Sequence, residues 1–103
     1  MVTLFNVAIR GYTAMSKKTS TEHVVSILNY FFMAVGRIVI KHRGFVKKYL
    51  GDGMLALFGA PLVTNNPPLD AVLAALEMVA MMEKVSQRSL EECGVAIKIG
   101  ISI

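Results

Sequence analysis

The stretch Phe45-Val-Lys-Lys-Tyr-Leu-Gly-Asp-Gly-Met-Leu-Ala-Leu-Phe-Gly-Ala-Pro61 predicts a strand, a tight turn and a second strand. The turn is expected at Gly51–Gly53, because glycine accepts a positive φ without steric cost. The nearly unbroken apolar run Met54–Phe58 is typical of a strand that is buried on both faces or against helices. Asp52 is therefore a single carboxylate at the tip of a hairpin, and Lys48 lies in the strand that leads to it.

Two interpretations of this hairpin are open. A turn that presents one acid beside a lysine-bearing strand suits a metal-bound polyphosphate. Asp-Gly is also a common hairpin signal, and lysines commonly protect strand edges, so the segment by itself favours a purely structural role. The rest of the chain has to decide between them.

The composition predicts one folded domain. The chain has 103 residues, of which 54% are hydrophobic and 17% charged, so it has enough apolar surface for a core and is not a disordered tail. Such a high apolar content in a short chain indicates an oligomer interface or partner elements outside the chain. The net charge of +4 fits polyphosphate ligands, nucleic acid or anionic membranes without distinguishing them.

Cysteine and histidine usage argues against two classes of site. Cys93 is the only cysteine, and His23 and His42 are the only histidines, so a disulfide framework is excluded and a zinc site is not expected. A reducing, cytoplasmic location is expected. No leader opens the chain, and no uncharged apolar run reaches the roughly 18 residues of a membrane span, so no membrane segment is expected in this chain.

The first half of the chain predicts a strand and a long helix. The strand is expected at Met1–Ile9 and the helix from Thr19–Glu22, whose first and last residues have the spacing of a capping box. The helix is expected to break near Gly36 and to end at Lys41–Gly44, where cations precede a glycine. Its expected buried stripe, at alternating steps of four and three, is Val24, Leu28, Phe31, Val35 and Ile38.

A second helix is expected after the hairpin. Asn66 is its expected cap, Pro67 its first residue, and Asp70 lies in its first turn. Its expected buried stripe is Leu69, Val72, Leu73, Leu76, Val79 and Ala80. The methionines expected as core filler are Met78, Met81 and Met82.

A last strand is expected at Val95–Ile103, so the elements follow the order strand, helix, strand, strand, helix, strand. This order predicts an α+β fold of the ferredoxin-like βαββαβ plan, an antiparallel-dominated sheet with helices on one face.

Three segments together resemble one family. They are Val2-Thr-Leu-Phe-Asn-Val-Ala-Ile-Arg-Gly-Tyr-Thr-Ala-Met-Ser16, Phe45–Pro61 and Ile97–Ile103, with a Pro-Leu-Asp-Ala helix start at Pro68–Ala71 between the last two. In this order and spacing they resemble the catalytic domain of class III nucleotidyl cyclases, the adenylyl and guanylyl cyclases. The resemblance implies that residues 1–103 are the N-terminal portion of such a domain, whose C-terminal part is absent from this chain.

The resemblance implies a reaction and its cofactors. The family closes ATP or GTP into a cyclic 3′,5′-monophosphate and releases pyrophosphate, at sites that two head-to-tail domains share, so a homodimer is the expected assembly. Two aspartates hold two magnesium or manganese ions, in agreement with the preference of Mg²⁺ for oxygen ligands. Asp52 matches the aspartate of the hairpin turn. Lys48 matches the lysine of adenylyl cyclases, which donates to adenine N1, so ATP is the expected substrate and no nucleic acid is expected as a partner.

The turn after the first strand matches the phosphate cradle of the family. Its expected phosphate-binding residues, acting mainly through backbone N–H groups, are Ile9, Arg10, Gly11, Tyr12 and Thr13. Ile9 is also expected to reach a metal ion through its backbone. For the Arg10 side chain, a phosphate contact and a plain surface position are equally good interpretations.

Ala8 departs from the family pattern, because the first metal aspartate is expected at this position. Alanine offers no oxygen to a metal, and the intact motif around it favours an introduced substitution over a natural loss. The asparagine and arginine that stabilise the transition state in the family are also not in this chain. The parent is therefore expected to be an adenylyl cyclase, and this polypeptide by itself to be inactive or nearly so.

Two other functions remain open. A degenerate cyclase domain that only dimerises or regulates is favoured by Ala8. A ferredoxin-like RNA-binding module is favoured by the partial basic, glycine and aromatic motif Arg43–Tyr49, with Phe5 as the one candidate for base stacking in the first strand.

Overall fold

The computed structural model of the chain describes residues 2–10, 17, 20–61, 63–93 and 98–103. Within these residues the elements are β1 (Thr3–Arg10), α2 (Thr21–Lys41), β2 (Gly44–Leu50), β3 (Gly53–Phe58), α3 (Pro67–Cys93) and β4 (Lys98–Ser102). The predicted order of strands and helices is confirmed.

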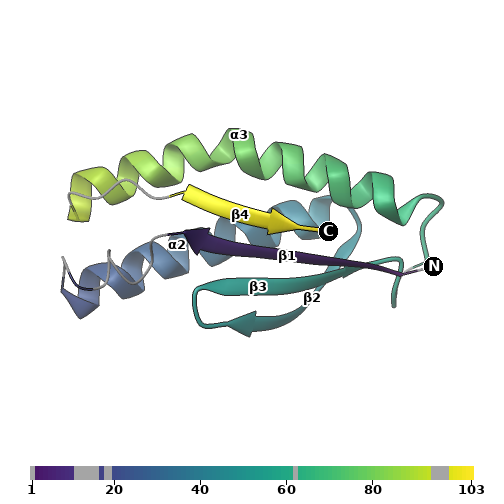
Figure 1. Cartoon of the computed structure of the whole chain (residues 1–103), viewed down its shortest axis with the longest axis horizontal. Coiled ribbons are helices and arrows are strands. Elements are labelled where there is room, and N and C mark those ends of the chain that lie inside the picture. The colour runs from purple at the N-terminus through teal and green to yellow at the C-terminus, as the bar shows by residue number, and fades with distance from the viewer. Residues whose placement is uncertain (1, 11–16, 18–19, 62, 94–97) are drawn as a thin grey trace.

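The four strands form one antiparallel sheet in the order β2-β3-β1-β4, with β1 and β3 in the centre. Both helices cover the same side of this sheet (Figure 1). Along β1, Phe5, Val7 and Ile9 are buried under the helices, whereas the side chains between them point the other way. The sheet therefore has a core face toward the helices and an outer face, and the predicted ferredoxin-like α+β plan is confirmed.

Helix α2 begins at a cap different from the predicted one. The hydroxyl of Ser20 accepts a hydrogen bond from the His23 N–H at 3.3 Å, so Ser20 rather than Thr19 is the N-cap; Thr19 lies outside the described residues. The helix continues through Gly36 without the predicted break, because a single glycine in a helix interior costs only about 1 kcal/mol relative to alanine. Its buried residues are Val24, Ile27, Phe31, Val35, Gly36, Ile38 and Val39, so the predicted stripe is confirmed except for Leu28, which is half-buried.

The end of α2 assigns different roles to two neighbouring residues. Arg43, not the glycine after it, takes the positive φ of 69° that turns the chain out of the helix. Gly44 is needed for close packing, since a Cβ there would lie 2.7 Å from Val39 Cγ1 and 2.8 Å from Phe58 Cε1. The predicted glycine at the helix end is therefore present, but its function is to let β2 approach the core.

Helix α2 is also long and apolar enough to cross a membrane, by length and composition alone. Charged residues interrupt it near both ends, which is why a search for uncharged runs passes over it. Its buried side chains belong to the core cluster that it forms with the sheet and α3. This packing is that of a core helix.

Helix α3 begins as predicted but buries a different face. The side chain of Asn66 accepts a hydrogen bond from the Leu69 N–H at 3.2 Å, which confirms Asn66 as the cap. After its first residue Pro67, which is also buried, the buried side chains of α3 are Ala71, Ala74, Met78, Met82, Val85 and Ser89. The large residues predicted for the buried stripe are exposed instead, at 43% to 62%, and they are Leu69, Val72, Leu73, Leu76 and Val79. Ala80 is exposed too.

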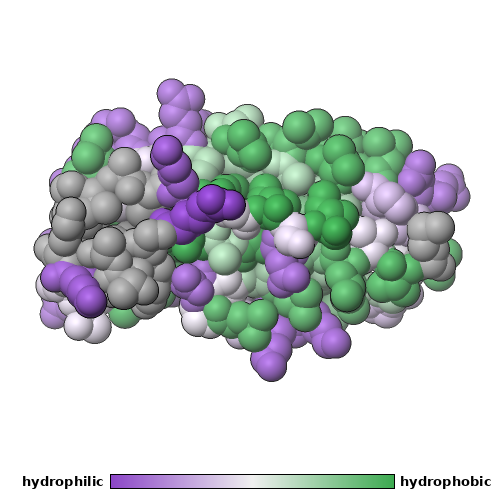
Figure 2. Space-filling view, viewed as in Figure 1, coloured by the Kyte–Doolittle hydropathy of each residue, from purple (hydrophilic) through white to green (hydrophobic). Residues whose placement is uncertain are grey.

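The error has a physical cause. Both stripes repeat at steps of three and four, so periodicity cannot choose between them. The small side chains of Ala71 and Ala74 let the helix lie close to the rest of the core. Met78 and Met82 fill the remaining space as predicted, and Met81, predicted with them, is half-buried against the core. Figure 2 shows the consequence, hydrophobic side chains gathered on the surface of α3, mainly over its N-terminal half.

The observed buried face of α3 predicts a large loss of stability for one substitution and almost none for another two residues away. Met78→Ala removes a fully buried side chain and should lower the free energy of unfolding by about 2–4 kcal/mol. Leu76→Ala, at a side chain 62% exposed, should change it by less than about 0.5 kcal/mol. Urea denaturation of both variants measures the difference. A larger loss in Leu76→Ala than in Met78→Ala would show that the predicted stripe, not the observed one, faces the core.

Candidate functional site

The hairpin between β2 and β3 has a two-residue turn. Leu50 pairs with Gly53, so only Gly51 and Asp52 lie between the strands, and Gly51 has the positive φ of 60° that a type II′ turn requires at its first central position. In β3 the residues on the core face are buried, but Leu55 and Leu57 on the outer face are only half-buried. Of the two predicted environments for this strand, packing against helices is confirmed and burial on both faces is wrong.

A backbone contact joins the hairpin turn to the end of β1. The N–H of Ile9 donates to the carbonyl oxygen of Asp52 at 3.0 Å. Ala8 pairs with Gly53, and a Cβ built on Gly53 would lie 3.1 Å from the Ala8 Cβ. The two positions expected to carry the metal aspartates, Ala8 in β1 and Asp52 in the hairpin turn, are therefore brought together, and one of them holds a carboxylate.

The other neighbour of Ala8 is covered by an arginine. Ala8 pairs with Gly100 of β4. A Cβ built on Gly100 would lie 3.0 Å from Arg10 Nε and 3.5 Å from one of its terminal guanidinium nitrogens. The Arg10 side chain therefore lies across Gly100, on the outer face of the sheet and beside Ala8.

The predicted phosphate cradle is visible only at its start. The N–H of Ile9 is already bonded to Asp52, so this donor is not free for a phosphate. Gly11, Tyr12 and Thr13 lie outside the described residues. Among the predicted phosphate ligands in the described part of the chain, the Arg10 guanidinium is thus the group with donors to offer.

Lys48 lies on the same outer face as Ala8. It pairs with Leu55, which in turn pairs with Asn6 of β1, so Lys48 and Asn6 are two strands, or about 10 Å, apart. The register between β2 and β3 shifts at Lys47, so this residue lies in a β-bulge and has no partner residue in β3. Both lysines are exposed.

Cations outnumber acids on this face. Within the strands and the hairpin turn, Arg10, Lys48 and Lys98 lie on the outer face beside the single carboxylate of Asp52. The described residues contain no group of three or more histidine, cysteine or acidic side chains that could hold a metal ion. The electrostatic character of the face suits an anionic ligand such as a polyphosphate.

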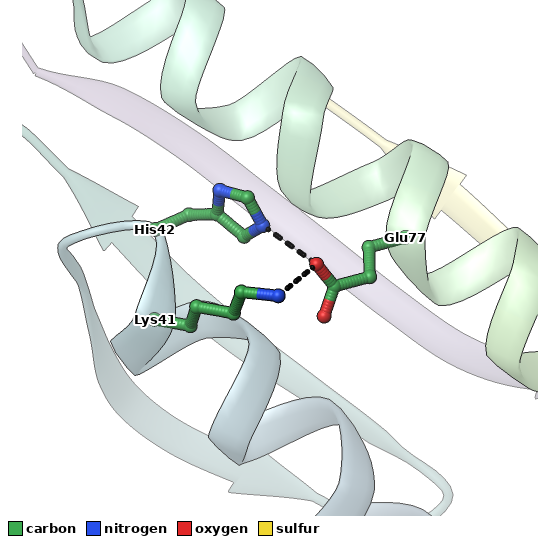
Figure 3. A network of polar contacts seen from close by, with 3 residues as sticks. All are labelled: Lys41, His42 and Glu77. Carbon is green, nitrogen blue, oxygen red and sulfur yellow. Dashed lines mark hydrogen bonds and ion pairs between the residues drawn. The ribbon is translucent and has the colours of Figure 1, made fainter.

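The polar cluster of Figure 3 is separate from this face. At the end of α2, Lys41 Nζ and His42 Nε2 lie 2.8 Å and 3.2 Å from the same carboxylate oxygen of Glu77 on α3. The hydrogen bond from Lys41, and to a smaller extent the one from His42, holds the pKa of the Glu77 carboxyl below its ordinary value. The cluster ties the two helices together, so His42 has a structural position at the end of α2.

The aromatic expected by the RNA-binding interpretation is not available for stacking. Phe5 is fully buried and makes an edge contact with Phe58, with ring centroids 5.6 Å apart. RNA-recognition sheets stack bases on exposed aromatics, so the first strand of this chain lacks the feature that such binding needs.

One functional candidate came only from the structure, namely the position of the Arg10 guanidinium over Gly100. The sequence carried one signal for it. Ala8 and Arg10 are two apart in a strand, so they share a face. The register with β4, which places Gly100 beside Ala8, required the fold.

The comparisons agree on one kind of domain. The family model described as the adenylate and guanylate cyclase catalytic domain matches residues 1–103. The chain is 30% identical to the adenylate cyclase of Anabaena cylindrica over 100 residues, which is 92% of this chain and 19% of that protein.

Two solved structures are also similar. One is the guanylyl cyclase Cya2, with a TM-score of 0.88 and 32% identity over 97% of this chain and 51% of that one. The other is the adenylyl cyclase CyaB from P. aeruginosa, with a TM-score of 0.89 and 25% identity over 97% of this chain and 53% of that one. The chain thus spans about half of these solved chains, and less than a fifth of the curated relatives it matches.

Proposed function

Because the chain belongs to the adenylate and guanylate cyclase catalytic domain family, we propose that its outer sheet face is the nucleotide site of an adenylyl cyclase. The parent activity would join the ribose 3′ oxygen of ATP to the α-phosphorus and release pyrophosphate. The observation that carries the proposal is the contact of the Asp52 turn with the end of β1, next to Ala8. This contact supports the proposal because it brings the Asp52 turn beside Ala8, the two positions at which the family resemblance expects its metal aspartates.

Lys48 supports ATP as the nucleotide. The similar proteins include both adenylyl and guanylyl cyclases, so family membership alone does not select a base. An ammonium group donates hydrogen bonds and cannot accept them, so it matches the unprotonated N1 of adenine and not the N1–H of guanine. Lys48 is exposed on the outer face, where a base is accessible to it.

The residues present do not fit the pair of magnesium or manganese ions that the family implies. Two such ions are held by carboxylates from both strands, and position 8 has a methyl group in place of one of them. Asp52 is the single carboxylate of the outer face and hairpin turn in the described part of the chain. We therefore propose that this chain binds the nucleotide but does not turn it over.

A second cyclase domain is the proposed partner. The outer face carries apolar side chains next to its cations, with Leu4 56%, Phe45 46% and Leu50 44% exposed. Exposed apolar groups rimmed by charge are typical of a protein interface. In a homodimer the two domains would contribute different residues to two shared sites, so Asp52 and Lys48 of one protomer need not contact the same nucleotide.

A second function is favoured by one observation. Ala8 suits a cyclase-like domain that has lost catalysis and retains dimerisation or regulation. Both functions include nucleotide binding. They differ in whether the substitution Ala8→Asp restores cyclase activity.

The proposal predicts binding without turnover. A fluorescent ATP analogue should bind to the purified protein in the presence of Mn²⁺, and unlabelled ATP should displace it at lower concentration than GTP. Chromatography of the same mixture should show no cyclic AMP above a protein-free blank. Cyclic AMP formed by the protein with Ala8 would contradict the proposed loss of turnover, and no binding of either nucleotide would contradict the proposed site.

A further inference from the structure

The Arg10 guanidinium occupies an unusual place for a surface arginine. Its Nε lies only 3.0 Å from where a Cβ of Gly100 would be, so the side chain lies along the sheet over Gly100 while the residue stays exposed. Gly100 is the direct cross-strand partner of Ala8, and such partners have Cα atoms about 5 Å apart. The guanidinium is thus held next to the position at which the family has its first metal ligand.

The row of residues across the sheet at this point is unusually shallow. Gly53, Ala8 and Gly100 lie side by side on β3, β1 and β4, so these three positions carry a single methyl group, and Leu50 of β2 closes the row beyond Gly53. Because Gly53 and Gly100 have no Cβ, neither residue places a side chain between Ala8 and an approaching ligand. Asp52 lies at one end of the row and the Arg10 guanidinium lies over the other.

We propose that this protein binds the polyphosphate of ATP without a divalent ion, with the Arg10 guanidinium next to Ala8 supplying the positive charge. The proposal rests on the proposed function, because it concerns the same nucleotide site. A guanidinium presents parallel N–H donors that match two oxygens of a phosphate, so it neutralises and orients the group at once. Lys48 and Lys98 on the same face add charge that is independent of metal.

Ala8 and Arg10 both favour binding of a phosphate group without a metal ion. With aspartate at position 8, a carboxylate would lie beside the guanidinium, compete with phosphate for its donors and repel the anion unless a metal ion intervened. With alanine there, no carboxylate at position 8 competes for the Arg10 donors, and no ion pair engages them within the described part of the chain. Loss of the metal ligand therefore creates the conditions for metal-free binding.

The test measures dissociation constants for ATP and for inorganic tripolyphosphate, at one fixed ionic strength, with Mn²⁺ and with EDTA. ATP is expected to bind the protein within about threefold of the same affinity in both conditions, since a phosphate–guanidinium contact replaces the ion. Tripolyphosphate should compete with ATP in EDTA, because the contact is to phosphate rather than to the base.

Three variants make the test specific. Arg10→Gln should weaken binding in EDTA by about tenfold or more, the factor expected for one lost hydrogen-bonded charge contact. Arg37→Gln removes the same charge from an exposed position on α2 and should change binding by less than about twofold. Ala8→Asp should make binding dependent on Mn²⁺, with about tenfold weaker affinity in EDTA than in Mn²⁺.

The outcomes separate the two proposals. Binding in EDTA that Arg10→Gln removes and Arg37→Gln leaves intact supports the inference. Binding that requires Mn²⁺ in the unaltered protein overturns the inference and leaves the proposed nucleotide site standing. Equal losses in Arg10→Gln and Arg37→Gln also overturn it, because they show a non-specific charge effect. Binding in neither condition overturns the proposed function itself.

Discussion

Replacing Ala8 by aspartate is expected to raise cyclic AMP production by about a hundredfold or more in a protein that carries the complete cyclase domain. The new carboxylate would lie between Gly53 and Gly100, which have no side chains to obstruct it. The contact from the Ile9 N–H already holds the Asp52 turn against the end of β1. The substitution would therefore restore the missing member of a pair whose backbone is in place.

The matched control is Ala8→Asn, which has nearly the same shape as aspartate without the charge. Initial rates with saturating ATP and Mn²⁺ compare the two variants, and circular dichroism checks that both are folded. Activity that returns with aspartate and not with asparagine is the expected result. If neither variant is active although both bind ATP, the domain is a regulatory relative of the cyclases and the enzymatic part of the proposed function is wrong.

Replacing Lys48 by glutamate is expected to reverse the base preference. The ratio of the ATP and GTP dissociation constants should move toward GTP by about 10- to 100-fold, because glutamate accepts hydrogen bonds from guanine N1–H and its amino group and leaves adenine N1 unpaired. Displacement of a fluorescent nucleotide by ATP and by GTP measures this ratio and does not require catalysis.

Lys47→Glu is the control for this exchange. It makes the same change of charge one residue away, in the bulge of β2, and should leave the ratio within about twofold. An unchanged ratio in Lys48→Glu would remove Lys48 from base recognition. Equal shifts in both variants would show that the net charge of the strand, and not a directed hydrogen bond, sets the preference.

The hairpin and the first helix show what the sequence determined well. Local steric rules predict a tight turn at Gly51–Gly53, where Gly51 takes a positive φ and Gly53 already belongs to β3. The hydrophobic period of α2 places Phe31 and Val35 in the core, as observed. These features depend on interactions between residues near in sequence, so one chain is enough to predict them.

Helix α3 shows where the sequence did not suffice. Both of its apolar stripes have the helical period, and only contact with the sheet selects the face that contains Ala71 and Met78. The N-cap of α2 was ambiguous in the same way, since the side chains of Thr19 and Ser20 can both accept the capping hydrogen bond and the chain path selects Ser20. Tertiary packing therefore supplied the information that was missing.

The candidate site divides in the same way. Asp52, Ala8 and Lys48 were recognised from motifs, and the structure places all three on the outer face or in the turn beside it. The register of β1 with β4, which brings Gly100 and the Arg10 guanidinium beside Ala8, links segments about 90 residues apart and left no local trace in the sequence.

The central claim is that a nucleoside triphosphate binds where the Asp52 turn meets the end of β1. Amide chemical shifts of the ¹⁵N-labelled protein during titration with ATP test it most directly. We predict that the largest changes fall on Ala8, Arg10, Asp52, Gly53 and Gly100. Changes confined to the surfaces of α2 and α3, or no changes at millimolar ATP, would contradict it.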